Sequence, residues 1–240
     1  MLLALDETRF RVNIARSFVL YNERMSNRTT PKGARTRADI LHTAVDIASV
    51  EGLDGLSIGR LASELGMSKS GLFAHFGSKE SLQLAAIEEA RLRYVKEVIE
   101  PALSSPLGIT QLYALCTAFL SYIERSVFVG GCFFASAMAE FDAKGPSLVR
   151  DRIVECQEQW MMTLERAAEG ARANGEFRVD SDSRQLAFEL EGALLTANWY
   201  FHLFHDATNI DRARRAVRTR LSREATQVGL DLLPLEPQDS

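Results

Sequence analysis

The stretch Ser57–Phe76 reads SIGRLASELGMSKSGLFAHF and decides how the N-terminal part of the chain folds. Two short segments, 58–65 and about 69–76, carry apolar residues at helical spacing, and Gly66 between them accepts the positive φ that a tight turn requires. Ser57 and Ser68 stand just before these segments, where a serine side chain can cap the first N–H groups of a helix. Ala62 is small where the two helices must cross closely. The pattern predicts a helix-turn-helix, which presents its second helix to the DNA major groove.

Helical periodicity continues on both sides of this motif, and no strand-like alternation persists. Upstream, a helix is expected from about Thr36, with Asp39 completing a capping pair, and Gly52 suits the position that ends it. Downstream, Ser78 begins a long helix that Pro101 stops near residue 100. Further helices are expected at 107–127, 132–142, 147–174, 183–206 and 210–229. The predicted fold class is therefore all-α, with an N-terminal three-helix helix-turn-helix domain and a C-terminal helical domain, to which the family resemblance described below assigns ligand binding and dimerisation.

Four segments of different character divide the chain. Residues 1–25 are expected to be a frayed or disordered extension, because Met25 is a plausible start in its own right. Residues 26–80 form the predicted DNA-binding domain, and residues 81–230 form a second helical domain, for which the family resemblance described below implies regulation and dimerisation. Residues 231–240 are expected to be a loose tail.

Composition excludes several classes of protein. The 240 residues are 46% hydrophobic and 25% charged, which is ordinary for a globular chain and too apolar for a disordered one. The three cysteines, Cys116, Cys132 and Cys156, are widely spaced, which favours buried thiols in a reducing cytoplasm over disulfides or a zinc site. His202, His205 and Asp206 lie close enough in sequence to hold a metal, but packing or capping roles are favoured. No metal and no cofactor is predicted.

Targeting and membrane segments are not expected. Charged residues interrupt the first apolar stretch, so no secretory signal is visible. The longest uncharged stretch, 101–123, contains two prolines and a glycine, and is interpreted as a helix break followed by a buried helix. We therefore expect a cytoplasmic protein without a membrane partner.

Charge is unevenly distributed along the chain, although its formal total is −4. Residues 26–79 hold seven Lys+Arg against five Asp+Glu, whereas residues 80–240 hold 17 against 24. A basic end on an acidic body suits contact with phosphates at that end alone. The basic stretch 28–37 is expected to follow the DNA backbone or to reach the minor groove, and the alternative is a solvated leader without contact.

The segment Gly66–Leu82, GMSKSGLFAHFGSKESL, resembles the signature of the TetR family of tetracycline-repressor-like bacterial regulators. Gly52–Ile58, GLDGLSI, is similar to the family's link between its first two helices. The resemblance covers residues 35–82 and is specific. The rest of the chain resembles the family only in being helical and of the expected length.

This resemblance implies which residues contact DNA. Those at the start of the second helix, at the groove-facing end of the third and at the start of the fourth would meet phosphates or bases. Phe73 stands where the family usually has tyrosine and cannot donate a hydroxyl hydrogen bond. Gly71 stands where a small β-carbon residue is common, and lets the backbone approach the bases closely. The candidate residues are Arg35, Ser57, Ser68, Lys69, Ser70, Gly71, Phe73, His75 and Lys79.

The resemblance also implies a ligand cavity in the C-terminal domain, whose occupant moves the long fourth helix shared by both domains. The candidate lining is largely aromatic, which favours a small apolar or aromatic effector, although such residues also fill cores. The candidate lining residues are Phe119, Tyr122, Phe133, Phe134, Met138, Trp160 and Trp199.

A symmetric dimer is expected, because one recognition helix buries little surface and a two-fold pair reads a palindrome. The hairpin of helices 183–206 and 210–229 is the predicted interface, since Gly192 and Ala193 permit close helix approach. The alternative is that its apolar stripes only close the core of the monomer.

The sequence thus predicts a sequence-specific transcriptional regulator, most often a repressor in such families, released from a palindromic operator by an effector. The alternative is a helical interaction protein whose helix-turn-helix no longer binds specific DNA. No spacing of residues supports an enzyme.

Overall fold

The computed structural model describes residues 31–234, and the side chains of residues 36–234. The expectations on residues 1–25, on the side chain of Arg35 and on the tail beyond residue 234 lie outside this range. The helices are α2 (Pro31–Gly55), α3 (Ile58–Leu65), α4 (Lys69–Phe76), α5 (Lys79–Tyr94), the π-helical turn η1 (Val95–Ile99), α6 (Glu100–Ala102), α7 (Ile109–Glu124), α8 (Phe133–Phe141), α9 (Leu148–Ala173), α10 (Ser183–Phe204), α11 (Thr208–Glu224) and α12 (Gln227–Leu232). The predicted all-α fold is confirmed.

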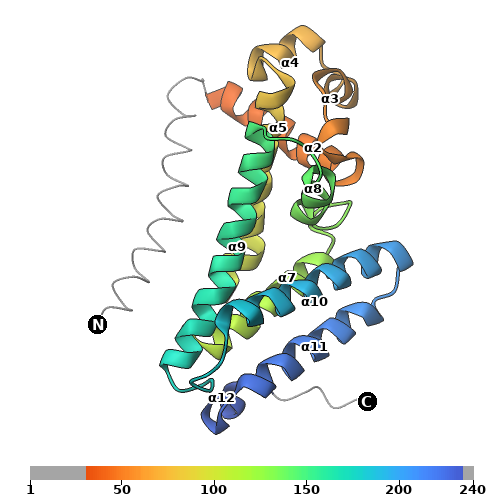
Figure 1. Ribbon diagram of the computed structural model, residues 1–240. Coiled ribbons are helices and arrows are strands. Elements are labelled where there is room, and N and C mark those ends of the chain that lie inside the picture. The colour runs from red at the N-terminus through yellow and green to blue at the C-terminus, as the bar shows by residue number, and fades with distance from the viewer. Residues whose placement is uncertain (1–30, 235–240) are drawn as a thin grey trace.

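The described chain is an elongated body with a small head at one end (Figure 1). Helices α2, α3 and α4 form the head, and α5 runs from it into the body beside α9. Helices α10 and α11 lie side by side as a hairpin against α7 at the far end. Helix α5 therefore belongs to both parts, as the sequence predicts.

Three serines and one glycine begin and end the head's helices as predicted. The hydroxyl oxygens of Ser57, Ser68 and Ser78 accept hydrogen bonds from the N–H groups three residues on, at 3.0–3.1 Å. Gly66 ends α3 at φ 62°, in the left-handed region that glycine tolerates best. These local signals placed both helices of the motif at their predicted bounds, 58–65 and 69–76.

Three boundaries differ from the prediction. Helix α2 already begins at Pro31, so Thr36 lies inside it and does not form the predicted cap. The predicted helix 210–229 breaks at Ala225, because the strand-like bridge to Phe177 interrupts it before α12. Leu233 is only 5% exposed and packs on the core, so the loose tail does not begin at residue 231.

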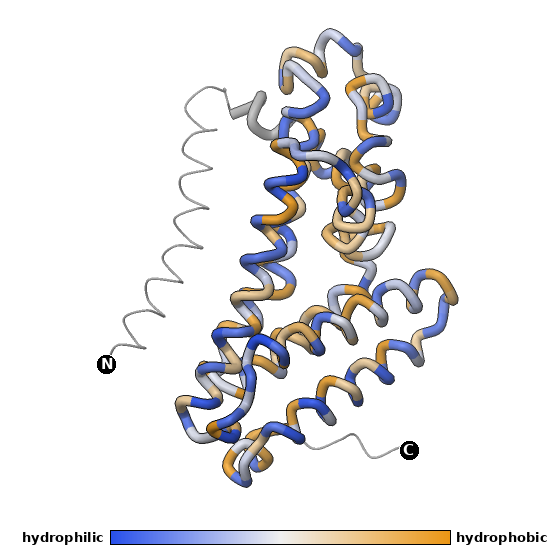
Figure 2. Tube along the Cα trace, viewed as in Figure 1, coloured by the Kyte–Doolittle hydropathy of each residue, from blue (hydrophilic) through white to orange (hydrophobic). Residues whose placement is uncertain are grey.

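Hydrophobic and hydrophilic residues are interspersed along the helices, as the amphipathic pattern predicts (Figure 2). One continuous set of buried side chains runs from the head through the body. Of the apolar stripe predicted for helix 210–229, Ala213, Val217 and Leu221 of α11 are buried against the body, whereas Val228 lies in α12 and is 57% exposed. For α11, the stripe therefore closes the core of the monomer, which is the alternative that the sequence left open.

The loop before α8 and α8 itself join the head to the body. Gly130 lies so close to α2 that an added Cβ would stand 1.9 Å from the carbonyl oxygen of Ser49. Glu140 of α8 accepts hydrogen bonds from the N–H groups of Leu53 and Asp54, at 2.7 and 2.8 Å. Its carboxylate thereby satisfies the backbone where the regular part of α2 ends. The head is therefore fixed to the body through α8 as well as through α5.

Candidate DNA-binding face and ligand cavity

Buried side chains hold α4 against α3 in one orientation. Leu61 and Leu72 are fully buried between these helices, and Ala62 is nearly so. At the crossing, a Cβ added to Gly59 would lie 3.5 Å from Cε of Lys69, so the lysine stem covers that glycine. This packing fixes which face of α4 is turned outward.

The outward face of α4 carries the predicted base-reading residues. Lys69 and Ser70 are exposed, and the side chain of Phe73 is 54% exposed. Among the described lysines and arginines of the head, Lys69 has no carboxylate within salt-bridge distance, whereas Arg60 pairs with Glu51. Lys69 is therefore available to an external anion.

The other predicted DNA residues have partners inside the protein. Ser57 and Ser68 use their hydroxyl oxygens as helix caps. Lys79 donates a hydrogen bond to the carbonyl oxygen of Asp54 at 2.7 Å. His75 is half-buried, and its ring packs beside Phe76.

Gly71 has a reason within the fold for lacking a side chain. A Cβ at this position would stand 3.0 Å from the capping oxygen of Ser68. Crowding of the cap therefore explains this glycine without a bound base, although close approach to DNA stays a prediction.

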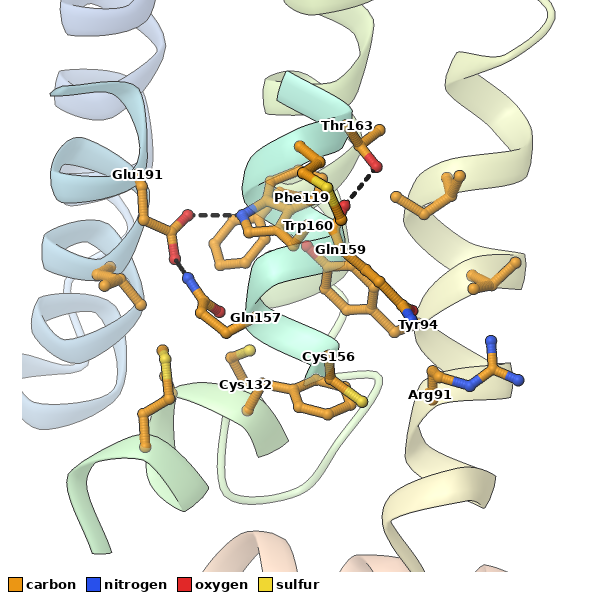
Figure 3. A pocket seen from close by; sticks show the side chains of 17 residues that line it. Arg91, Tyr94, Phe119, Cys132, Cys156, Gln157, Gln159, Trp160, Thr163 and Glu191 are labelled. Atoms are coloured by element: carbon orange, nitrogen blue, oxygen red, sulfur yellow. Dashed lines mark hydrogen bonds between the residues drawn. The ribbon is translucent and has the colours of Figure 1, made fainter. Parts of the chain in front are cut away.

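A cavity of about 260 Å³ lies in the body, enclosed by α5, η1, α7, α8, α9 and α10 (Figure 3). Four of the predicted lining residues, Phe119, Phe134, Met138 and Trp160, line it. Tyr122 and Phe133 do not, because both are buried in the core beside it. Trp199 does not either, because it points outward from α10 and is 49% exposed.

Glu191 of α10 is the main lining residue that sequence reasoning missed. It is 8% exposed, and its carboxylate accepts hydrogen bonds from Nε1 of Trp160 at 2.6 Å and Nε2 of Gln157 at 3.0 Å. Burial raises the pKa of this carboxyl above its ordinary value of 4.5, and the two hydrogen bonds oppose that rise. The sequence contains a signal for this residue, because a glutamate on the apolar face of an amphipathic helix is unusual. Glu191 lies on the same face of α10 as the buried Ala187, Leu190 and Leu194.

The buried carboxyl predicts a pH-dependent cost of folding. Because the folded-state pKa of Glu191 is raised, the folded protein binds more protons than the unfolded one above pH 4.5, so this group destabilises it progressively as pH rises. We expect Glu191→Gln to raise the melting temperature, by an amount that grows between about pH 5 and pH 7. Circular dichroism melts across this range measure it, and parallel curves for the two proteins would contradict it.

Other chemistry is sparse in the described part of the chain. All three cysteines are free and buried, as expected. Burial raises the pKa of the Cys132 and Cys156 thiols to about 11. Residues 31–234 contain no cluster of His, Cys, Asp and Glu able to hold a metal ion, and no helix there is both long and apolar enough to cross a bilayer.

A helix-turn-helix head, joined through α5 and α8 to a helical body that contains a cavity of about 260 Å³, defines the general class of the protein. Residues 40–86 match the family described as bacterial regulatory proteins, tetR family. Residues 108–217 match the tetracyclin repressor-like C-terminal domain. The chain belongs to the TetR family, as the resemblance of its head predicts.

The chain is also similar to individual proteins of this kind. The chain is 35% identical to the HTH-type transcriptional repressor AcnR of Corynebacterium efficiens over 79 residues, which are 33% of this chain and 42% of that protein. It thus spans well under half of that relative's length. The solved structure of a TetR transcriptional regulator from Chloroflexus aurantiacus is 26% identical, has a TM-score of 0.76 and covers 82% of this chain and 98% of its own.

A third comparison concerns a structure with bound ligands. AibR, solved in complex with isovaleryl coenzyme A and operator DNA, is 19% identical and has a TM-score of 0.60. The alignment covers 78% of this chain and 96% of AibR. At this identity the likeness concerns the fold.

Proposed function

We propose that this protein is a dimeric, sequence-specific transcriptional repressor that a small molecule bound in the body cavity releases from a palindromic operator. The observation that carries the proposal is the outward face of α4, where Lys69, Ser70 and Phe73 are exposed on a helix fixed by its buried side. An exposed lysine and an exposed ring on a second helix-turn-helix helix suit phosphate, base-edge and thymine-methyl contacts.

Phosphate contacts would surround this face. Ser57 precedes α3, His75 lies in the last turn of α4, and α5 begins at Lys79. Lys79 would exchange its hydrogen bond to the Asp54 carbonyl for one to a phosphate. The basic residues before residue 36, Arg35 among them, would follow the backbone or enter the minor groove.

The dimer would form chiefly through α10 and only at its margin through α11. One face of α10 is buried in the monomer, whereas Trp199, Tyr200, Leu203 and Phe204 are exposed near its end. Gly192 on the same helix has open space around it. By contrast, the exposed side of α11 is rich in arginine. An exposed apolar row of this kind is typical of a protein interface.

This interface predicts a change of oligomeric state. We expect Leu203→Glu to convert the dimer to a monomer, because Leu203 is 70% exposed and a charge buried at its place would be unpaired. Light scattering coupled to size-exclusion chromatography measures the mass. Val179→Glu is the matched control, because Val179 is exposed but lies in the turn before α10. If Leu203→Glu remains a dimer, the proposal that this part of α10 forms the interface is contradicted.

The effector would act through two elements that reach from the cavity to the head. Helix α5 contributes Tyr94 to the lining and continues directly to Lys79. Helix α8 contributes Phe134 and Met138 and then holds the head through Glu140. A ligand that fits one arrangement of these helices better than the other would shift the population away from the DNA-binding spacing.

Relatives support the proposal. The similar AcnR of Corynebacterium efficiens is named a transcriptional repressor, and AibR was solved with operator DNA and an acyl coenzyme A together. A regulator of this kind acts in the cytoplasm and is not itself an enzyme. A salt-dependent mobility-shift assay with the DNA flanking the gene tests the proposal. A protected inverted repeat supports it, and binding without sequence preference favours the helical interaction protein instead.

A further inference from the structure

The body cavity contains a carboxylate without a cation. Among the described residues that line it, Glu191 is the only acid. Two neutral donors, on Trp160 and Gln157, occupy its oxygens, and no described lysine or arginine nitrogen lies within salt-bridge distance. Burying an ionised carboxylate costs free energy unless a positive charge is paired with it.

The one positively charged side chain of the lining is already engaged. Arg91 donates from Nε to Glu88 at 3.1 Å, and Glu88 also pairs with Arg152 of α9. Figure 3 shows Arg91 on the side of the cavity opposite Glu191, with the rings of Tyr94 and Trp160 between them. Arg91 therefore does not neutralise Glu191.

Aromatic rings occupy the space next to this carboxylate. The ring of Tyr94 meets the rings of Phe119, Phe134 and Trp160 edge-on, at centroid distances of 6.4, 5.8 and 5.5 Å. Trp160 is also stacked with Phe119. Aromatic faces attract organic cations, most strongly where water is excluded, and the methyl groups of such cations pack well against the rings.

We propose that the cavity binds a small organic cation of the quaternary ammonium class, with Glu191 as its counter-ion and Tyr94, Phe119 and Trp160 around its alkyl groups. The volume of about 260 Å³ suits a small head of this kind. The inference rests on the proposed function only in treating the cavity as the effector site. It adds a positive charge to the small apolar or aromatic effector that the sequence favours, because the lining carries a carboxylate without a paired cation.

The fluorescence of Trp160 measures binding directly. Trp160 donates its N–H to Glu191, and Trp199→Phe leaves it as the only tryptophan of the chain. The probes are choline and the neutral alcohol that carries a tert-butyl group in place of choline's trimethylammonium head. We expect saturable quenching by choline with an affinity at least about tenfold above that of the neutral alcohol.

Further substitutions in the Trp199→Phe protein show whether choline binding depends on the charge of Glu191 or on the shape of the cavity. Glu191→Gln should weaken choline at least about tenfold and leave the neutral alcohol unchanged, whereas Glu191→Asp, which retains the charge, should keep the preference for the cation. Glu169→Gln is the matched control, because it removes the same charge from an exposed position of α9. Circular dichroism shows that each variant is folded.

Three results would overturn the proposal: equal affinity for the two probes, choline binding unaffected by Glu191→Gln, or no saturable choline binding. DNA binding by the ligand-free protein is measured separately. Specific DNA binding without choline binding supports the proposed regulator function and contradicts the proposed quaternary ammonium ligand. Choline binding without any DNA binding supports the proposed ligand and contradicts the proposed regulator function.

Discussion

Lys69→Ala should weaken binding to the operator by about 30-fold, because a symmetric dimer loses about 1 kcal/mol at each half-site. Lys69 has the largest expected effect in the head, since it is exposed on α4 and no described carboxylate competes for it. Its Cε and Nζ lie beside Gly59, 3.5 and 3.7 Å from the place that a Cβ on this glycine would take. Fluorescence anisotropy with labelled operator, repeated over a range of salt, measures the loss.

The salt series separates two roles for this lysine. If Lys69 neutralises a phosphate, its removal lowers the slope of log affinity against log salt by about 0.9 in each half-site, or about two for the dimer. If it reads bases, the slope changes little and the preferred sequence relaxes. Lys96→Ala is the matched control, because Lys96 is an exposed lysine of the body. Equal losses for Lys69→Ala and Lys96→Ala would contradict the placement of the DNA face on α4.

Gly130→Ala should destabilise the protein by roughly 3 kcal/mol or more, a large effect for one methyl group. The added Cβ would stand 1.9 Å from the carbonyl oxygen of Ser49, and backbone at the end of α2 cannot move aside as a flexible side chain can. The N–H of Gly130 also donates to the hydroxyl oxygen of Ser49 at 3.1 Å, a bond that the shift would break. The loop before α8 would then separate from the head.

Thermal unfolding followed by circular dichroism measures this effect. For a chain of this size, the expected loss lowers the melting temperature by about 6–12 °C. Gly145→Ala is the matched control, because a Cβ at Gly145 meets no atom within 4 Å. A Gly130→Ala protein as stable as Gly145→Ala would show that the head does not depend on this contact.

Local signals explain why the head could be predicted from sequence. Ser57, Gly66 and Ser68 act on backbone groups within three or four residues, so their effect is visible in the order of residues. The bounds of α3 and α4 follow directly from them. The start of α2 was placed too late, because the capping pair Thr36 and Asp39 was preferred to Pro31, although proline is common at the first position of a helix.

Contacts between distant segments explain what sequence reasoning missed. The break at Ala225 depends on its bridge to Phe177, and the join of head to body depends on Gly130 meeting Ser49. The helical periodicity of the sequence does not indicate either of these two contacts. The cavity shows the same limit, because Tyr122 and Trp160 are both aromatic residues at buried helix positions, yet only Trp160 lines it.

Selection of DNA from a random pool tests the proposed reading of DNA most directly. The protein should retain sequences that share an inverted repeat, with half-site centres about 10 base pairs apart or a multiple of that spacing, as two symmetry-related α4 helices require. Lys69→Ala should lose or relax this enrichment. A pool without an enriched repeat, or with a single unrepeated site, would contradict the account of a two-fold regulator that reads DNA through α4.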